Sequence, residues 1–91
     1  MKMVSHQIPK KNENISYSKI KNEILIFNIK NEHYYSLNET GGRIFELCDN
    51  RNTIIVISKT ISKEFGVEES TSHIDTVCLL MDLCQEGIIT I

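Results

Sequence analysis

The spacing of apolar residues changes between Glu32 and Cys48, from every second position to every third or fourth. The first half, residues 33–37, alternates between two faces and is rich in aromatic side chains, which is typical of a half-buried strand. In the second half, apolar or small residues recur at helical spacing, at Gly41, Ile44, Phe45 and Cys48. The pattern therefore predicts a strand that leads directly into a helix.

Asn38 is the predicted N-cap of this helix. Its side chain can accept a hydrogen bond from a backbone N–H of the first turn, which has no partner within the helix itself. Glu39 follows at the first helical position, where the positive end of the helix dipole favours a carboxylate. The boundary between strand and helix is therefore predicted at Asn38.

Three consecutive strands are predicted before this helix. The tripeptide Lys-Asn-Glu occurs at Lys21 and again at Lys30, and Asn tolerates a positive φ and is common in tight turns. Two turns at these places would join residues 15–20, 24–29 and 33–37 into an antiparallel meander. The middle strand is apolar on both faces, which suits a central position, so residues 33–37 are expected at an edge of the sheet.

A second helix is predicted from Thr53, its N-cap, to about Phe65, with Gly66 as a left-handed C-cap. The run from Thr53 to Ile57 is β-branched, and by propensity alone it suits a strand. The helix is preferred because helical spacing continues through residues 58–65. Its apolar face would consist of Ile54, Ile57, Ile61 and Phe65.

A third helix is predicted to begin after a cap at Ser70 or Thr71 and to end near Glu86, with residues 88–91 as a short strand or tail. Its apolar residues form two adjacent stripes, Thr76, Leu79, Leu80 and Leu83 in one and Ile74, Val77, Met81 and Cys84 in the other. Together they are wider than a helix covered on one side requires. Either the helix is wedged between the sheet and the other helices, or part of the second stripe lines an open groove.

The composition is that of one small globular domain, since 41% of the 91 residues are hydrophobic and 24% are charged. Residues 1–14 are expected to form a flexible polar lead-in and residues 15–91 a single domain. No apolar run approaches the about 20 residues of a membrane span and no signal-peptide pattern occurs, so a cytoplasmic location is expected. The net charge of −2 gives no electrostatic reason to expect nucleic acid or an anionic membrane as a partner.

Neither a catalytic constellation nor a metal site is predicted. Cys48, Cys78 and Cys84 form no Cys-x-x-Cys pair, so buried, reduced thiols are expected rather than a metal or redox site. The pair Gly41-Gly42 lacks the further glycine and the lysine of a phosphate-binding loop. We therefore expect no enzyme activity and no cofactor.

A DNA-binding winged helix is one alternative, because such domains also combine a sheet with three helices. No Lys or Arg occurs from Glu68 to Ile91, however, whereas recognition helices normally use several of them to neutralise phosphates. A structural protein-interaction module is the other alternative that the sequence leaves open.

The strand-to-helix segment resembles that of PqqD-like proteins, which are peptide recognition elements in pathways for ribosomally made, modified peptides. The matching run is Leu37-Asn38-Glu39-Thr40-Gly41-Gly42-Arg43-Ile44-Phe45-Glu46-Leu47, and the similarity continues with Thr53, Ile57, Phe65-Gly66-Val67, Asp75, Leu79-Leu80, Leu83 and Glu86-Gly87-Ile88. The resemblance covers about residues 15–91. It implies an α+β fold, a three-stranded antiparallel β-meander followed by three α-helices in a winged helix-turn-helix-like arrangement.

In that family a leader peptide docks between the third strand and the third helix, and the resemblance implies the same groove here. The strand wall would consist of Tyr34, Tyr35, Ser36 and Leu37, and the helix wall of Ile74, Val77, Cys78 and Met81. Ordinary sheet packing is the alternative role for the two tyrosines. The implied function is non-catalytic: to capture a precursor peptide by strand addition and present it to a leader peptidase and cyclase of a lasso-peptide pathway, or to a radical SAM enzyme.

Two further expectations concern partners. Lys19, Lys21, Lys30 and Arg43 are candidates for ion pairs with an acidic leader. Ile55 and Val56 stand where relatives usually carry acidic residues. They either mark a contact with a processing enzyme or with a second copy of the domain, or are buried by rotation of the helix.

Overall fold

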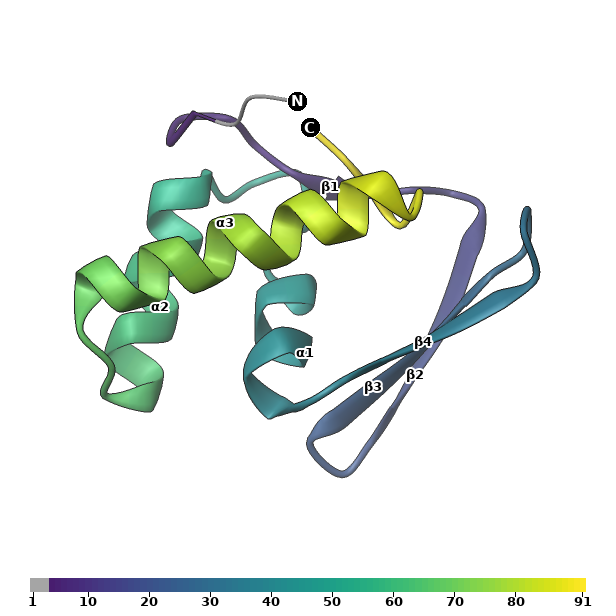
Figure 1. Cartoon of the computed structure of the whole chain (residues 1–91), viewed down its shortest axis with the longest axis horizontal. Coiled ribbons are helices and arrows are strands. Elements are labelled where there is room, and N and C mark those ends of the chain that lie inside the picture. The colour runs from purple at the N-terminus through teal and green to yellow at the C-terminus, as the bar shows by residue number, and fades with distance from the viewer. Residues whose placement is uncertain (1–3) are drawn as a thin grey trace.

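The protein, here as a computed structural model described over residues 4–91, combines a three-stranded sheet with three helices and a pair of short strands (Figure 1). The sheet is antiparallel and has the order β2 (Ile15–Ile20), β3 (Glu23–Asn28), β4 (His33–Leu37). The helices α1 (Glu39–Glu46), α2 (Ile54–Phe65) and α3 (Glu69–Gln85) follow along the chain. The predicted α+β meander followed by three helices is confirmed.

Both hairpins of the sheet lie where the repeated tripeptide predicts turns, but asparagine is not the residue with the left-handed backbone. Positive φ angles occur at Lys21 (58°) and Glu32 (61°) instead. Asn31 contributes through its side chain, whose Oδ1 atom accepts a hydrogen bond from the His33 N–H at 3.0 Å. The turns are confirmed, whereas the conformation assumed for their asparagines is wrong.

The transition from β4 to α1 is as predicted. Asn38 has an extended backbone, and its Oδ1 atom accepts a hydrogen bond from the Gly41 N–H at 2.9 Å. Gly42 lets α1 approach the sheet closely, because a Cβ atom there would lie 3.2 Å from the side chain of Ile24. The helix therefore starts directly beneath the end of the edge strand.

The β-branched segment after Thr53 is helical, as preferred. The Thr53 hydroxyl accepts a hydrogen bond from the Val56 N–H at 3.2 Å, and Gly66 ends the helix with a φ of 67°. Ile54 and Ile57 are completely buried in the core, and their spacing of three residues puts them on one face of a helix, whereas in a strand they would point to opposite faces.

The predicted start of α3 is wrong. The helix begins at Glu69 with Glu68 in the N-cap position, so Ser70 and Thr71 lie inside its first turn. Glu68 makes no side-chain capping bond, and Ser70 Oγ donates to its Oε1 atom at 2.7 Å. The end of α3 at Gln85 agrees with the prediction.

A second, two-stranded sheet joins the two ends of the described chain. β1 (Lys10–Lys11) pairs antiparallel with β5 (Ile89–Thr90). Pro9 is buried, and the carbonyl of Gln7 accepts a hydrogen bond from the Ile54 N–H at 3.0 Å. The sequence predicted no element before residue 15; residues 1–3 of the expected lead-in lie outside the described chain, and its flexibility stays a prediction.

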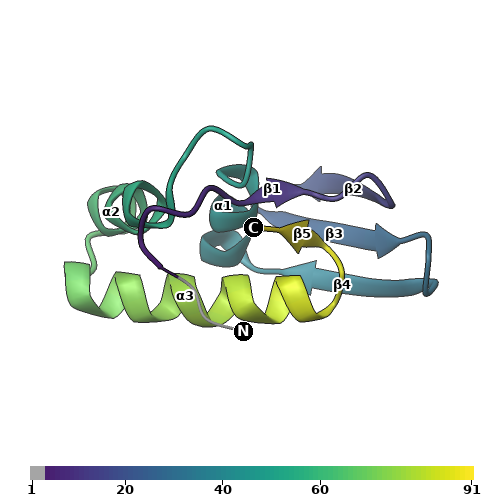
Figure 2. The ribbon, with the colours of Figure 1, turned by 90° about the horizontal axis from the view of Figure 1, so that it is seen from above.

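The core lies between the inner face of the sheet and the helices, which stand on the same side of it (Figures 1 and 2). Ile24 and Ile26 of β3 point into the core, while Leu25 between them is exposed on the opposite face. α3 contributes a buried stripe of Ser72, Thr76, Leu80 and Leu83. Within residues 4–91, no helix is long and apolar enough to cross a membrane.

Candidate functional site

β4 is an edge strand, as the sequence predicted. Within the part of the chain that the structure describes, it pairs with β3 and with no strand on its other side. In an antiparallel edge strand, alternate residues direct their N–H and C=O groups away from the sheet. β4 therefore offers a row of backbone donors and acceptors to a further strand.

The side chains of β4 alternate between the two faces of the sheet. Leu37 is buried on the helix side, and Ser36 is exposed on the other. Tyr34 is 66% exposed on the outer face, and its ring packs on Phe27 with 4.7 Å between the centroids. Tyr34 thus makes an ordinary sheet contact, and most of its surface remains accessible.

Tyr35 connects β4 to the C-terminal end of α3. Its hydroxyl donates to Glu86 Oε2 at 2.7 Å and accepts a hydrogen bond from Asn31 Nδ2 at 3.3 Å. The hydrogen bond to the Glu86 carboxylate is the main cause that raises the pKa of the Tyr35 phenol above its ordinary value. This contact joins the strand and the helix at one end of the space between them.

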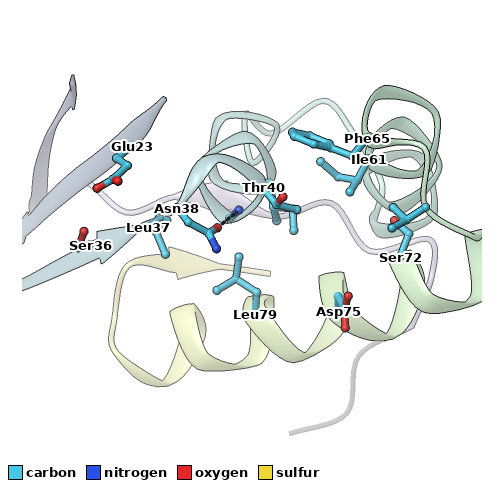
Figure 3. A pocket seen from close by; sticks show the side chains of 13 residues that line it. Glu23, Ser36, Leu37, Asn38, Thr40, Ile61, Phe65, Ser72, Asp75 and Leu79 are labelled. Carbon is cyan, nitrogen blue, oxygen red and sulfur yellow. Dashed lines mark hydrogen bonds between the residues drawn. The ribbon is translucent and has the colours of Figure 1, made fainter. Parts of the chain in front are cut away.

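A cavity of about 710 Å³ lies between β4, α1, α2 and α3 (Figure 3). This volume falls within the about 300–1,000 Å³ of typical ligand pockets. Its apolar lining comes from all four elements and from the loop between α2 and α3, and its larger side chains are Leu37, Ile44, Ile61, Phe65, Val67 and Leu79. A Cβ atom at Gly41 would lie 3.2 Å from Asn38 Oδ1, which is a tight contact, and 3.5 Å from Leu79, so the glycine gives the capping side chain of Asn38 its room.

The helix wall of this cavity differs from the one expected from the family resemblance. Ser72, Asp75 and Leu79 are the residues of α3 that line it. Figure 3 shows Leu79 pointing from α3 towards Leu37 and Asn38. Ile74, Val77, Cys78 and Met81 lie outside the lining, and Ile74 and Met81 are 61% and 43% exposed.

Asp75 and Leu79 line the cavity but were not predicted as part of the helix wall. Both are nevertheless among the residues that carried the family resemblance. Leu79 lies at the edge of the buried stripe of α3 and is only half-buried. Both explanations for the wide apolar arc therefore apply in part. Thr76, Leu80 and Leu83 of the first stripe are buried in the core. Leu79, at the edge of the same stripe, lines the open cavity, whereas the second stripe does not.

Two of the four cations proposed to attract an acidic leader, Lys19 and Arg43, form ion pairs within the protein. Lys19 forms an ion pair with Glu46 at 3.3 Å, and Arg43 binds Glu64 at 2.8 Å. The hydrogen bonds from Arg43 hold the pKa of the Glu64 carboxyl below its usual range. The cavity itself is lined by Glu23 and Asp75 and by neither Lys nor Arg.

The cysteines are free thiols but are not all buried as expected. Cys48 is buried, and burial raises its pKa to about 12. Cys84 is partly buried, whereas Cys78 is exposed, so the prediction is wrong for Cys78. Among residues 4–91, no group of three or more His, Cys, Asp or Glu side chains is placed to hold a metal ion.

Ile55 and Val56 were expected to be either a partner contact or buried by rotation of the helix. Ile55 is half-buried, and its N–H donates to the carbonyl of Ser5 at 3.0 Å. Val56 remains 45% exposed. Rotation of the helix therefore does not bury Val56.

Comparison with solved structures gives three similar folds, all below 25% identity. TbiB1 in complex with the TbiA(beta) leader peptide has a TM-score of 0.81 at 21% identity, over 88% of this chain and 93% of that chain. A lasso peptide synthetase B1 complexed with its leader peptide has a TM-score of 0.83 at 16% identity, over 93% and 100%. The PqqD part of Methylobacterium extorquens PqqCD, described as a stand-alone RiPP recognition element, has a TM-score of 0.80 at 14% identity, over 99% and 96%.

A search of curated proteins finds no significant match. The family model of coenzyme PQQ synthesis protein D (PqqD), in contrast, matches residues 23–89. The match begins at the first residue of β3 and ends within β5, so it contains β4, all three helices and the complete lining of the cavity. This protein belongs to the PqqD family.

Proposed function

We propose that this protein binds the leader segment of a ribosomally made precursor peptide and presents it to a tailoring enzyme, without catalytic activity of its own. The observation that carries the proposal is the unpaired edge of β4 beside the cavity at α3. Two proteins of the same fold are described as complexes with leader peptides, and a third as a recognition element. A peptide that adds a strand to β4 would lie between β4 and α3.

Strand addition makes use of both faces of β4. Side chains of an added strand alternate, so those on the helix side come next to Tyr35 and Leu37. A side chain beside Leu37 would enter the cavity and contact Leu79. The strand wall of the proposed site is therefore Tyr34 to Leu37, and its helix wall is centred on Leu79.

The expected affinity is modest. About four strand-to-strand hydrogen bonds at about 1 kcal/mol each and two or three buried side chains at about 2 kcal/mol each give about 10 kcal/mol. Loss of rotational and translational freedom and ordering of the peptide offset several kcal/mol of this. A dissociation constant no tighter than about micromolar follows.

A pair of variants on opposite sides of α3 tests the site. A fluorescent leader segment of a candidate precursor peptide is titrated with the unaltered protein, with Leu79→Arg, which fills the cavity, and with Ile74→Arg, which adds the same group to the outer surface. We expect Leu79→Arg to weaken binding more than tenfold, since it removes an apolar anchor site worth about 2 kcal/mol, and Ile74→Arg to change it less than twofold. Circular dichroism confirms that both variants are folded.

The reverse result, with loss only in Ile74→Arg, would favour the helix wall of Ile74, Val77, Cys78 and Met81 predicted from the sequence. Absence of saturable binding by the unaltered protein would reject the proposal. Presentation to the enzyme is measured separately, as turnover of the precursor by the tailoring enzyme with and without this protein. No change on its addition would limit the function to binding.

A further inference from the structure

Carboxylate side chains gather at the groove between β4 and α3. Glu23 and Asp75 line the cavity, and Figure 3 shows them on opposite sides of Leu79. A neighbouring depression, lined by Ser36 and Glu23 as well, adds Glu39 and a single lysine, Lys21. The entrance next to β4 is therefore predominantly negative.

Few cations are available to neutralise this charge. The ion pairs within residues 4–91 involve Lys19 and Arg43 with Glu46 and Glu64, and none includes Glu23 or Asp75. The chain from Glu68 to Ile91 contains neither Lys nor Arg, so α3 carries carboxylates without a lysine or arginine to pair with them. Lys30 lies in the β3–β4 hairpin, beside Glu86 in another depression.

We propose that the groove selects a leader with Lys or Arg next to the apolar residue that enters the cavity; this inference rests on the proposed function. A strand added to β4 with its apolar residue at Leu79 carries its neighbouring side chains past Glu23 on one side and Asp75 on the other. A cationic side chain on either side of the anchor gains one carboxylate partner there, Glu23 or Asp75. An acidic side chain meets like charge, which reverses the expectation of an acidic leader from the sequence.

The solvent exposure of Glu23 and Asp75 determines how strongly each of them can change peptide affinity. Both carboxylates lie at the solvent-accessible mouth, so each pair is expected to behave as a surface ion pair. Such pairs change affinity by about two- to fivefold each and weaken as salt rises. The two carboxylates therefore contribute more to the selectivity of peptide binding than to its overall affinity.

The probe is a set of randomised twelve-residue peptides displayed on phage and selected on the 91-residue protein. Binders that depend on Leu79, judged by loss of binding to Leu79→Arg, are sequenced, and one is synthesised with its basic residue kept, replaced by Gln, or replaced by Glu. We expect enrichment of Lys or Arg near the apolar anchor. We also expect a dissociation constant that rises from Lys to Gln to Glu and a smaller difference at 500 mM than at 50 mM salt.

Matched variants assign the effect to the groove. Asp75→Asn and Glu23→Gln are each expected to weaken the Lys peptide two- to fivefold and to leave the Gln peptide unchanged. Glu13→Gln, an exposed carboxylate between β1 and β2, removes the same charge away from the groove and is expected to have no effect. Leu79-dependent peptides without basic residues, or equal effects of all three variants, would overturn the charge selection but not peptide binding. Failure to obtain any Leu79-dependent binder would overturn both.

Discussion

The three cysteines illustrate how much the surroundings of single residues differ within similar sequence patterns. All three lie in apolar helical patterns, yet Cys48 is buried and Cys78 is exposed on α3 next to Leu79. A thiol reacts as the thiolate, and burial raises the pKa of Cys48 to about 12, so almost no thiolate exists there near neutral pH. Cys78 is therefore a natural reporter beside the proposed groove.

Alkylation with iodoacetamide at pH 8, followed by mass spectrometry, is expected to modify Cys78 first and Cys48 only when the protein unfolds. Bound leader peptide is expected to leave the rate of modification of Cys78 nearly unchanged, because Cys78 lies outside the cavity lining, one helical turn from Ile74 on the outer surface of α3. Cys84, which is partly buried and whose pKa is raised by burial, serves as the internal control. Severalfold slower modification of Cys78 with saturating leader would instead place the peptide against the helix wall of Ile74, Val77, Cys78 and Met81 predicted from the sequence.

At the scale of elements, the helix starts show which sequence signals are sufficient. Asn38 and Thr53 were predicted as caps because each has a side chain suited to an N-cap at the position where the helical pattern begins, and both make the expected bonds. Before α3, residues 68–72 are all polar and offer several candidates. The helix takes the earliest start, where the Ser72 N–H already donates to the carbonyl of Glu68 at 2.9 Å.

The two confirmed caps predict different consequences for function. Asn38→Ala and Thr53→Ala each remove one side-chain capping bond and are expected to cost about 1 kcal/mol, which lowers the melting temperature by about 4–8 °C for a domain of this size. Asn38 also lines the cavity at the start of α1. Only Asn38→Ala is therefore expected to weaken leader binding as well.

Thermal unfolding followed by circular dichroism and leader titration at 20 °C separate the two effects. Thr53→Ala is the matched control, since its stability loss is similar and its helix start lies outside the cavity lining. Equal loss of binding in both variants would mean that binding follows global stability rather than the position of α1.

At the scale of the whole molecule, the sequence predicts which residues of β4 face the helices, but not how α3 is rotated towards them. Alternation in residues 33–37 determines which side chains face the helices, because a strand has only two faces. The sequence pattern of α3 shows how wide its apolar surface is, but not how the helix is rotated about its axis relative to β4. That rotation depends on packing of Thr76, Leu80 and Leu83 in the core, which leaves Leu79 and Asp75 at the cavity.

The connection between the two ends of the chain was equally inaccessible to sequence reasoning. β1 is two lysines long and has no hydrophobic pattern. Its contacts are long-range: the Lys11 ammonium donates to the carbonyls of Glu46 and Cys48 at 3.2 and 3.0 Å and lies 4.9 Å from the centre of the Phe45 ring. Lys11 thereby satisfies carbonyl groups at the end of α1.

Deletion of residues 1–12 tests whether this segment is a flexible lead-in or part of the folded domain. The deletion removes buried Pro9, the pairing with β5, and backbone hydrogen bonds to Asn50, Ile54 and Ile55. At about 1 kcal/mol for each of roughly four bonds, we expect a loss of about 3–4 kcal/mol, a large part of the stability of a small domain. Urea unfolding should show this as a lower midpoint. Lys11→Met, which keeps the apolar stem and removes the ammonium, should lose about 1 kcal/mol. Because the groove lies at β4 and α3, leader affinity of the folded deletion variant should change less than twofold; an unchanged urea midpoint would instead support a flexible lead-in.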